Sequence, residues 1–131
     1  MLRLFLGAAT LAVACGPDPL CACASTTTLL FGTVKTSAGA AIQAATLTGY
    51  GTPLPGSCAP STRILNQTAS NSNGAYRLQL TELAPSDSEC VFLAVHAPGG
   101  TGLRDTTLGP LRLRMRAELA DSLAVNVVLS P

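Results

Sequence analysis

The sequence predicts an all-β fold, a sandwich of seven strands that follows a cleaved signal peptide. The segment Asn71–Leu80 (NSNGAYRLQL) places an Asn-Ser-Asn-Gly turn directly before alternating apolar and polar residues, a pattern typical of a β-hairpin. Similar short runs, separated by Gly, Pro, Asn and Ser, recur at regular intervals along the chain. After residue 14 no segment has a convincing helical periodicity.

The composition indicates one small domain. The 131 residues suffice for a single domain, and a hydrophobic content of 47% provides for a core. Aromatic residues make up only 4%, so we expect cross-links to add to the stability of the core. Removal of Arg3 with the signal peptide leaves 8 − 1 = 7 basic residues against 7 acidic ones. This balance argues against nucleic-acid binding, which needs a clustered positive excess.

Residues 1–14 have the pattern of a signal peptide. Arg3 precedes the apolar run Leu4–Val13, which is shorter than the ~20 residues of a membrane-spanning helix. The segment Leu11–Gly16 (LAVACG) resembles the lipobox of bacterial lipoproteins, which implies acylation of Cys15. Ala12 occupies the position where that motif usually has Leu, Val or Ile. Ordinary cleavage after an Ala-x-Ala site is the alternative.

The resemblance to the lipobox also implies a location. Gly16 stands where an Asp retains many Gram-negative lipoproteins in the inner membrane, so a Gram-negative host would place the protein in the outer membrane. Residues 15–28 are predicted to form the lipidated cysteine and a tether, because they contain two prolines and show no periodicity. Residues 29–131 are predicted to form the domain.

Four cysteines remain if Cys15 is acylated, and in an exported chain they predict two disulfides. The sequence alone leaves three connectivities open. Cys21 and Cys23 are too close to pair comfortably with each other, so we expect one to reach Cys58 and the other Cys90. A zinc site is the alternative, but Cys-x-Cys is not the usual ligand spacing, and we predict neither a metal nor a cofactor.

The domain begins with two predicted strands and a loop. Thr28–Thr36 and Gln43–Tyr50 alternate apolar and polar residues, and Gly51–Ser61 holds three prolines and two glycines. Thr62–Ala69 and the hairpin strand Tyr76–Leu80 follow. Cys90–Ala97 is almost wholly apolar and is typical of a central strand. Two further strands are predicted: one beginning at Leu111, where Leu and Met alternate with Arg, and a last one at Leu123–Leu129.

Two of these segments, supported by Val95–Gly99, carry a resemblance to a known family. Gly39–Leu47 resembles the motif Gly-x-Pro-Leu-x-Gly-Ala-x-Val, with Ala41 and Ala44 in place of Pro and the second Gly. Ser70–Leu78 resembles Thr-Asp-x-x-Gly-x-Tyr-x-Leu, with Asn71 in place of Asp and with Gly74 and Tyr76 matching. Both motifs are typical of the carboxypeptidase regulatory-like domain. That family implies a transthyretin-like Greek-key β-sandwich and no common reaction.

Catalytic residues are not arranged in any recognisable motif, and the chain is predicted not to be an enzyme. His96 is the only possible imidazole base, with Asp105 as an orienting acid and Ser57 or Ser61 as a nucleophile. No nucleophile-elbow motif accompanies them. A lone histidine on a core strand is more often a structural residue.

Two sets of residues are candidates for binding. Arg112, Arg114 and Arg116 form a basic row that could contact anionic lipid headgroups, lipopolysaccharide or an acidic partner protein, although we favour a solvated edge strand, kept from pairing by its charges, as the explanation of the row. Tyr50, beside the Pro-rich loop, is the one plausible stacking residue for a sugar. We therefore expect a non-catalytic cell-envelope lipoprotein, anchored in the membrane by lipid, that acts as a structural or protein-interaction module. A module that binds an envelope or extracellular glycan is the alternative.

Overall fold

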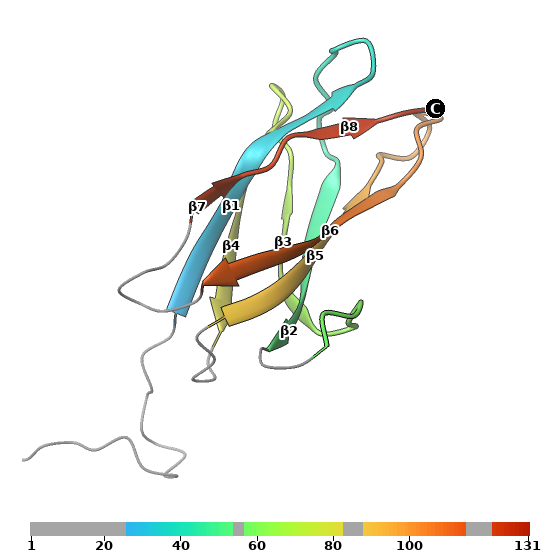
Figure 1. Cartoon of the computed structure of the whole chain (residues 1–131). Coiled ribbons are helices and arrows are strands. Elements are labelled where there is room, and N and C mark those ends of the chain that lie inside the picture. Colours follow the sequence, from blue (N-terminus) through green and yellow to red (C-terminus); the bar gives the residue numbers. More distant parts are fainter. Residues whose placement is uncertain (1–25, 54–56, 83–87, 115–121) are drawn as a thin grey trace, which may run out of the picture.

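The computed structural model describes residues 26–53, 57–82, 88–114 and 122–131. It confirms the predicted all-β sandwich, which is built from two sheets of four strands each (Figure 1). In chain order the strands are β1 (Thr26–Thr36), β2 (Thr46–Pro53), β3 (Ile64–Ala69), β4 (Ala75–Glu82), β5 (Ser88–His96), β6 (Thr106–Arg114), β7 (Ser122–Ala124) and β8 (Val127–Leu129).

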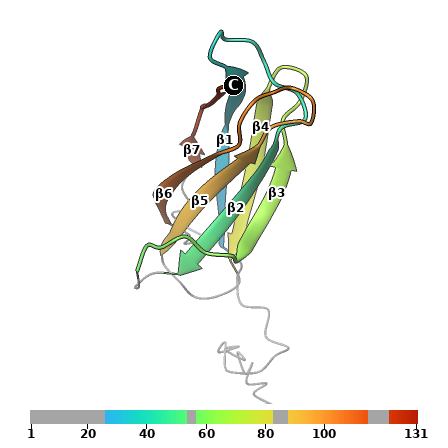
Figure 2. The ribbon, with the colours of Figure 1, turned by 90° about the vertical axis from the view of Figure 1, so that its right-hand side faces the viewer.

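The two sheets differ in the direction of their strands. In the first sheet, β1 pairs with β4 in the antiparallel sense and with both β7 and β8 in the parallel sense. The second sheet has the order β3-β2-β5-β6 and is antiparallel throughout. Figure 2 shows this second sheet as a layer of neighbouring strands in front of β1 and β4.

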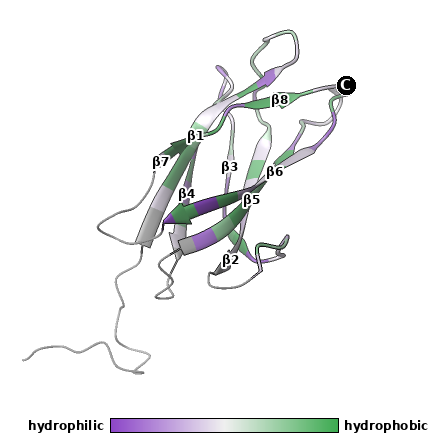
Figure 3. Cartoon of the chain, viewed as in Figure 1, coloured by the Kyte–Doolittle hydropathy of each residue, from purple (hydrophilic) through white to green (hydrophobic). Residues whose placement is uncertain are grey.

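The core lies between the sheets and follows the alternation of the sequence. Tyr76, Leu78 and Leu80 of β4 are buried, whereas Arg77 and Gln79 between them are exposed, as the hairpin pattern predicts. Figure 3 shows the same alternation along β6. The opposite wall of the core is formed by Leu47 of β2 and by Val91, Leu93 and Val95 of β5.

The turn before β4 is held by the side chain of Asn71. Its Oδ1 accepts hydrogen bonds from the backbone amides of Asn73 at 2.9 Å and Ala75 at 3.0 Å. Gly74 has a φ of 73°, and its carbonyl oxygen accepts a hydrogen bond from the Val34 amide at 2.7 Å. The turn is therefore fixed both internally and to β1.

The connection from β1 to β2 is pinned by Ser70. Its buried hydroxyl donates to the Ile42 carbonyl at 2.6 Å and accepts from the Ala45 amide at 3.0 Å. Ala44 adopts a φ of 61°, a conformation that residues with a side chain seldom take. This local conformation explains why β2 begins at Thr46 and not at Gln43 as predicted.

The described residues form eight strands where seven were predicted, because the last predicted strand is interrupted. β7 and β8 pair with β1 at one constant register, for example Leu30 with Leu123 and Val34 with Val127. Between them the Asn126 side chain accepts from the Thr33 amide at 3.1 Å. The two strands therefore correspond to the single predicted strand Leu123–Leu129.

Other predicted boundaries also differ from the structure, as three examples show. β1 begins at Thr26, two residues before the predicted strand start at Thr28. β2 continues through Gly51 to Pro53, residues that were assigned to the loop on their composition. β6 begins at Thr106, five residues before Leu111, and contains the Gly109–Pro110 sequence. In β2 and β6, sheet pairing overrides the local preference of Gly and Pro for turns.

Candidate functional site

The outer face of the second sheet, the face turned away from the core, carries a row of apolar side chains across three strands. We call Ile64, Tyr50 and Phe92 the apolar row. Tyr50 of β2 lies opposite Ile64 of β3 and opposite Phe92 of β5. Ile64 is 60% exposed, and both aromatic residues are partly exposed. A row of partly exposed apolar side chains on the outer face of a sheet is a candidate contact surface.

A β-bulge sets the position of Phe92. The register between β5 and β6 shifts at this residue, so that Val91 pairs with Leu111 and Leu93 with Leu108. Gly109 and Pro110 therefore lie opposite Phe92. A Cβ atom at Gly109 would lie 3.0 Å from Cδ1 of Phe92, so glycine leaves room for the ring beside β6.

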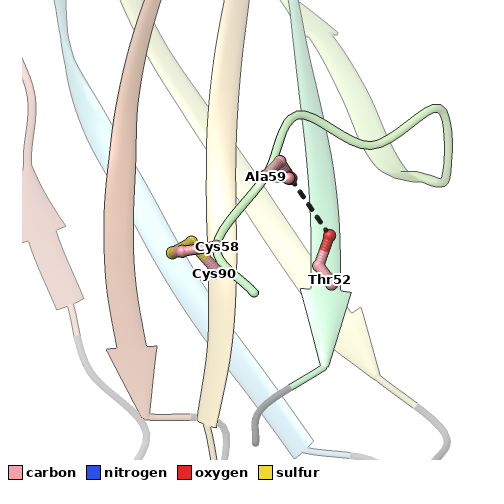
Figure 4. Close-up of a disulfide and its surroundings, with 4 residues drawn as sticks. All are labelled: Thr52, Cys58, Ala59 and Cys90. Carbon is pink, nitrogen blue, oxygen red and sulfur yellow. Dashed lines mark hydrogen bonds between the residues drawn. A yellow bond between two sulfur atoms is a disulfide. The ribbon is translucent and has the colours of Figure 1, made fainter. Parts of the chain in front are cut away.

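One side of the apolar row is bordered by residues 57–61, which we call the strap. Cys58 of the strap forms a disulfide with Cys90 of β5, with a Cα–Cα distance of 5.6 Å. The Thr52 hydroxyl of β2 donates a hydrogen bond to the Ala59 carbonyl at 3.4 Å. Figure 4 shows these two attachments, one to β5 and one to β2.

This disulfide corrects the predicted connectivity. We expected Cys58 and Cys90 each to pair with Cys21 or Cys23, but the two pair with each other. The reason is that the strap after β2 folds back onto β5, the neighbour of β2 in the sheet. Cys15, Cys21 and Cys23 lie outside the described residues, so lipidation of Cys15 stays a prediction.

An ion pair with one fully buried partner lies at the same end of the sandwich as the strap. Glu89 of β5 is fully buried and pairs with Arg63. The Arg63 Nε also donates to the Gly51 carbonyl at 3.2 Å. A side chain at Gly51 would collide with Glu89 and Leu65, so this position keeps space for the pair. Glu89 was not singled out from the sequence, although an acidic residue that begins an apolar run was a usable signal.

The structure places the described part of the basic row on the same outer face. Arg112 and Arg114 are exposed on β6, the edge strand of the second sheet. Arg112 lies opposite Cys90, the residue that holds the strap. Arg116 lies outside the described residues. Tyr50 and the arginines, two separate candidates in the sequence, are thus brought onto one face.

His96 and Asp105 also meet, but away from the serines. The His96 Nδ1 lies 2.8 Å from Oδ2 of Asp105, and the Ala97 amide donates to Oδ1 at 2.8 Å. The hydrogen bonds from His96 and Ala97 hold the pKa of the Asp105 carboxyl below its ordinary value. His96 ends β5, whereas Ser57 and Ser61 lie near Cys90 at its beginning, roughly 20 Å away at the rise of a strand.

A shallow apolar groove of about 390 Å³ lies between the β1–β2 and β5–β6 connections, with Ile42 and Leu103 on opposite sides. The part of the chain that the structure describes has no helix long and apolar enough to cross a membrane. Within those same residues, no group of three or more His, Cys, Asp or Glu side chains could hold a metal ion.

Comparison with models of protein families finds no match for the chain, and comparison with curated proteins finds none either. The function is therefore inferred from the site itself. Sequence reasoning identified Tyr50 and the arginines but missed Phe92 and Ile64 as its neighbours. Phe92 lies on the non-core face of a central strand, and an aromatic residue there was the available signal.

Proposed function

We propose that the chain is a non-catalytic cell-envelope lipoprotein whose β-sandwich acts as a structural or protein-interaction module, anchored through Cys15. The observation that carries this proposal is the apolar row, which presents Ile64, Tyr50 and Phe92 on a rigid antiparallel sheet. In a Gram-negative host the lipobox resemblance would place the protein in the outer membrane.

Two local conformations support the resemblance to carboxypeptidase regulatory-like domains. Ala44 has a positive φ at the position where that motif has its second glycine. Asn71 accepts two backbone hydrogen bonds through the side-chain oxygen that the usual aspartate also has. Both substituted positions therefore keep the backbone conformation that the original residue types favour.

The proposed absence of catalysis rests on the separation of the candidate groups. The His96–Asp105 pair holds the start of the β5–β6 connection through the Ala97 amide. The serines that were considered as nucleophiles lie at the other end of β5. A hydrolytic triad requires all three groups within hydrogen-bonding reach of one another.

The anchoring is tested by the intact mass of the mature protein from membrane and soluble fractions of its host. We expect a membrane-bound species that begins at Cys15 and carries acyl chains, and a Cys15→Ala variant that loses them and leaves the membrane. An unlipidated mass from the soluble fraction of the wild type would contradict the lipoprotein proposal.

A glycan-binding module is the second candidate, and the pairing of Tyr50 with Phe92 favours it. Aromatic side chains on a sheet face are suited to stacking against sugar rings, since both present flat apolar surfaces. A glycan array tests this function with the wild type and Tyr50→Ala. Saturable binding that Tyr50→Ala abolishes would support it, and no binding to any glycan would reject it.

A further inference from the structure

We propose that the outer face of the second sheet binds an anionic glycan, one whose sugar rings carry carboxylates as uronic acids do. A ring would lie against Tyr50 and Phe92 while its carboxylate pairs with Arg112. This inference rests on the glycan-binding candidate and names the class of ligand.

The charge of the sheet is the first reason. Among all residues of β2, β3, β5 and β6, the only carboxylate is that of Glu89. Glu89 is fully buried and paired with Arg63, so it does not face a ligand. Arg112 is exposed on the same sheet. The four strands thus present positive charge without exposed acidic residues, which complements an anion.

The register of the strands is the second reason. Arg112 lies opposite Cys90, and Cys90 is two residues before Phe92 on the same face of β5. Diagonal neighbours of this kind are roughly 7–8 Å apart in an antiparallel sheet. A carboxylated ring stacked on Phe92 and the long side chain of Arg112 together span that distance. Guanidinium groups bind carboxylates through two parallel hydrogen bonds.

Preorganisation is the third reason. The strap is tied to β5 by the disulfide and to β2 by the Thr52–Ala59 hydrogen bond, so it borders the apolar row at a fixed position. Phe92 is set by the bulge at Gly109. A ligand on this face would therefore need little ordering of the protein, which favours binding.

The test is calorimetric titration of the full mature chain with an oligogalacturonate of six residues. The same oligosaccharide with its carboxylates reduced to alcohols is the matched neutral probe, and poly-glutamate of similar charge is the non-sugar probe. We expect binding of the oligogalacturonate that weakens with added salt, weaker binding of the reduced form, and no binding of poly-glutamate.

Variants locate the site. Arg112→Gln is expected to weaken oligogalacturonate binding roughly tenfold or more, because it removes a hydrogen bond to a charged group. Arg112→Lys should retain part of the affinity. Tyr50→Ala should weaken binding, because it removes the ring against which the sugar stacks. Arg77→Gln is the control, because Arg77 is an exposed arginine on β4 of the other sheet and its loss should leave affinity unchanged.

The outcomes separate this inference from the function on which it rests. Equal binding of the acidic and reduced oligosaccharides would overturn the anionic ligand but leave glycan binding intact. Equal binding of poly-glutamate, or equal losses from Arg112→Gln and Arg77→Gln, would show unspecific charge attraction and overturn the site. If neither these oligosaccharides nor any glycan of the array binds, both the inference and the glycan-binding function are wrong.

Discussion

Tyr76 shows how one residue serves both packing and hydrogen bonding. Its ring is 3% exposed in a core that is poor in aromatic residues. Its hydroxyl donates a hydrogen bond of 2.6 Å to the Val125 carbonyl, between β7 and β8. Burial raises the pKa of Tyr76 to about 12, because the phenolate would lose its hydration. The neutral hydroxyl thus links β4 to the segment between β7 and β8.

The titration of Tyr76 is a direct prediction. The chain has two tyrosines, so Tyr50→Phe leaves Tyr76 alone, and its ultraviolet absorbance should change at a pKa of about 12. The pKa of Tyr76 in the folded chain lies above the ordinary value of 10.0. The stabilisation of the fold by the protonated Tyr76 hydroxyl is therefore fully present below pH 10 and is lost as the pH rises through about 12. A midpoint near pH 10 in protein that circular dichroism shows to be folded would contradict the prediction.

Alanine substitutions at three glycines distinguish the cost of backbone strain from the cost of a steric clash. Gly99→Ala should change the free energy of unfolding by less than ~0.5 kcal/mol, since a Cβ there meets nothing within 4 Å. Gly39→Ala, at a φ of 88° and in open space, should cost about 1–2 kcal/mol of strain. Gly74→Ala should cost more than Gly39→Ala, because its Cβ would also lie 2.5 Å from the Val34 carbonyl oxygen. Urea unfolding measures all three, and equal losses at Gly39 and Gly74 would contradict this order.

At the scale of elements, the sequence predicts most where local chemistry and sheet pairing agree. In the hairpin of Asn71–Leu80, the turn residues and the alternation favour the same structure, and both were predicted correctly. Pro53 and Gly109 show the opposite case, because each lies in a strand although its own preference is for a turn. Pro53 pairs with Glu89 of β5, and Gly109 lies in the bulge between Leu108 and Leu111, which both pair with β5. Pairing with a strand that is distant in sequence is invisible to a local pattern.

The interruption of the last strand gives an element-scale prediction. Asn126 accepts hydrogen bonds from the amide and the hydroxyl of Thr33, both at 3.1 Å. Asn126→Ala should cost about 1 kcal/mol and speed amide exchange at Thr33, whereas Asn126→Asp keeps the acceptor and should cost less. Asn73→Ala is the control, since Asn73 is exposed and contributes its backbone amide to the turn. Unchanged exchange at Thr33 in Asn126→Ala would contradict this role.

At the scale of the whole molecule, the candidate site arises from long-range register. Tyr50 and Arg112 were visible in the sequence as separate candidates. Their common face follows from the order β3-β2-β5-β6 and from the bulges at Tyr50 and Phe92. The Cys58–Cys90 disulfide likewise depends on β2 lying beside β5. Cysteine spacing alone could not choose it, because all three connectivities were open.

The disulfide should contribute to the stability of the whole domain. It joins residues 32 apart, and closure of a loop of this length restricts the unfolded chain by about 3–4 kcal/mol. The double variant Cys58→Ser, Cys90→Ser should lower the free energy of unfolding by roughly that amount, measured by urea unfolding. Thr52→Ala is the control that loosens the strap without removing the cross-link. If the double cysteine variant lost no more free energy of unfolding than Thr52→Ala, the cross-link would not stabilise the fold.

The parallel pairing of β1 with β7 and β8 has a mechanical consequence. β1 begins at Thr26 at one end of the sandwich, and β8 ends at Leu129 at the opposite end (Figure 1). A force that pulls these two residues apart acts along the strands, so it loads the hydrogen bonds between them together and does not open them one at a time. A domain held at Thr26 and pulled from beyond Leu129 is therefore built to resist tension, because its first and last strands can separate only by sliding past each other.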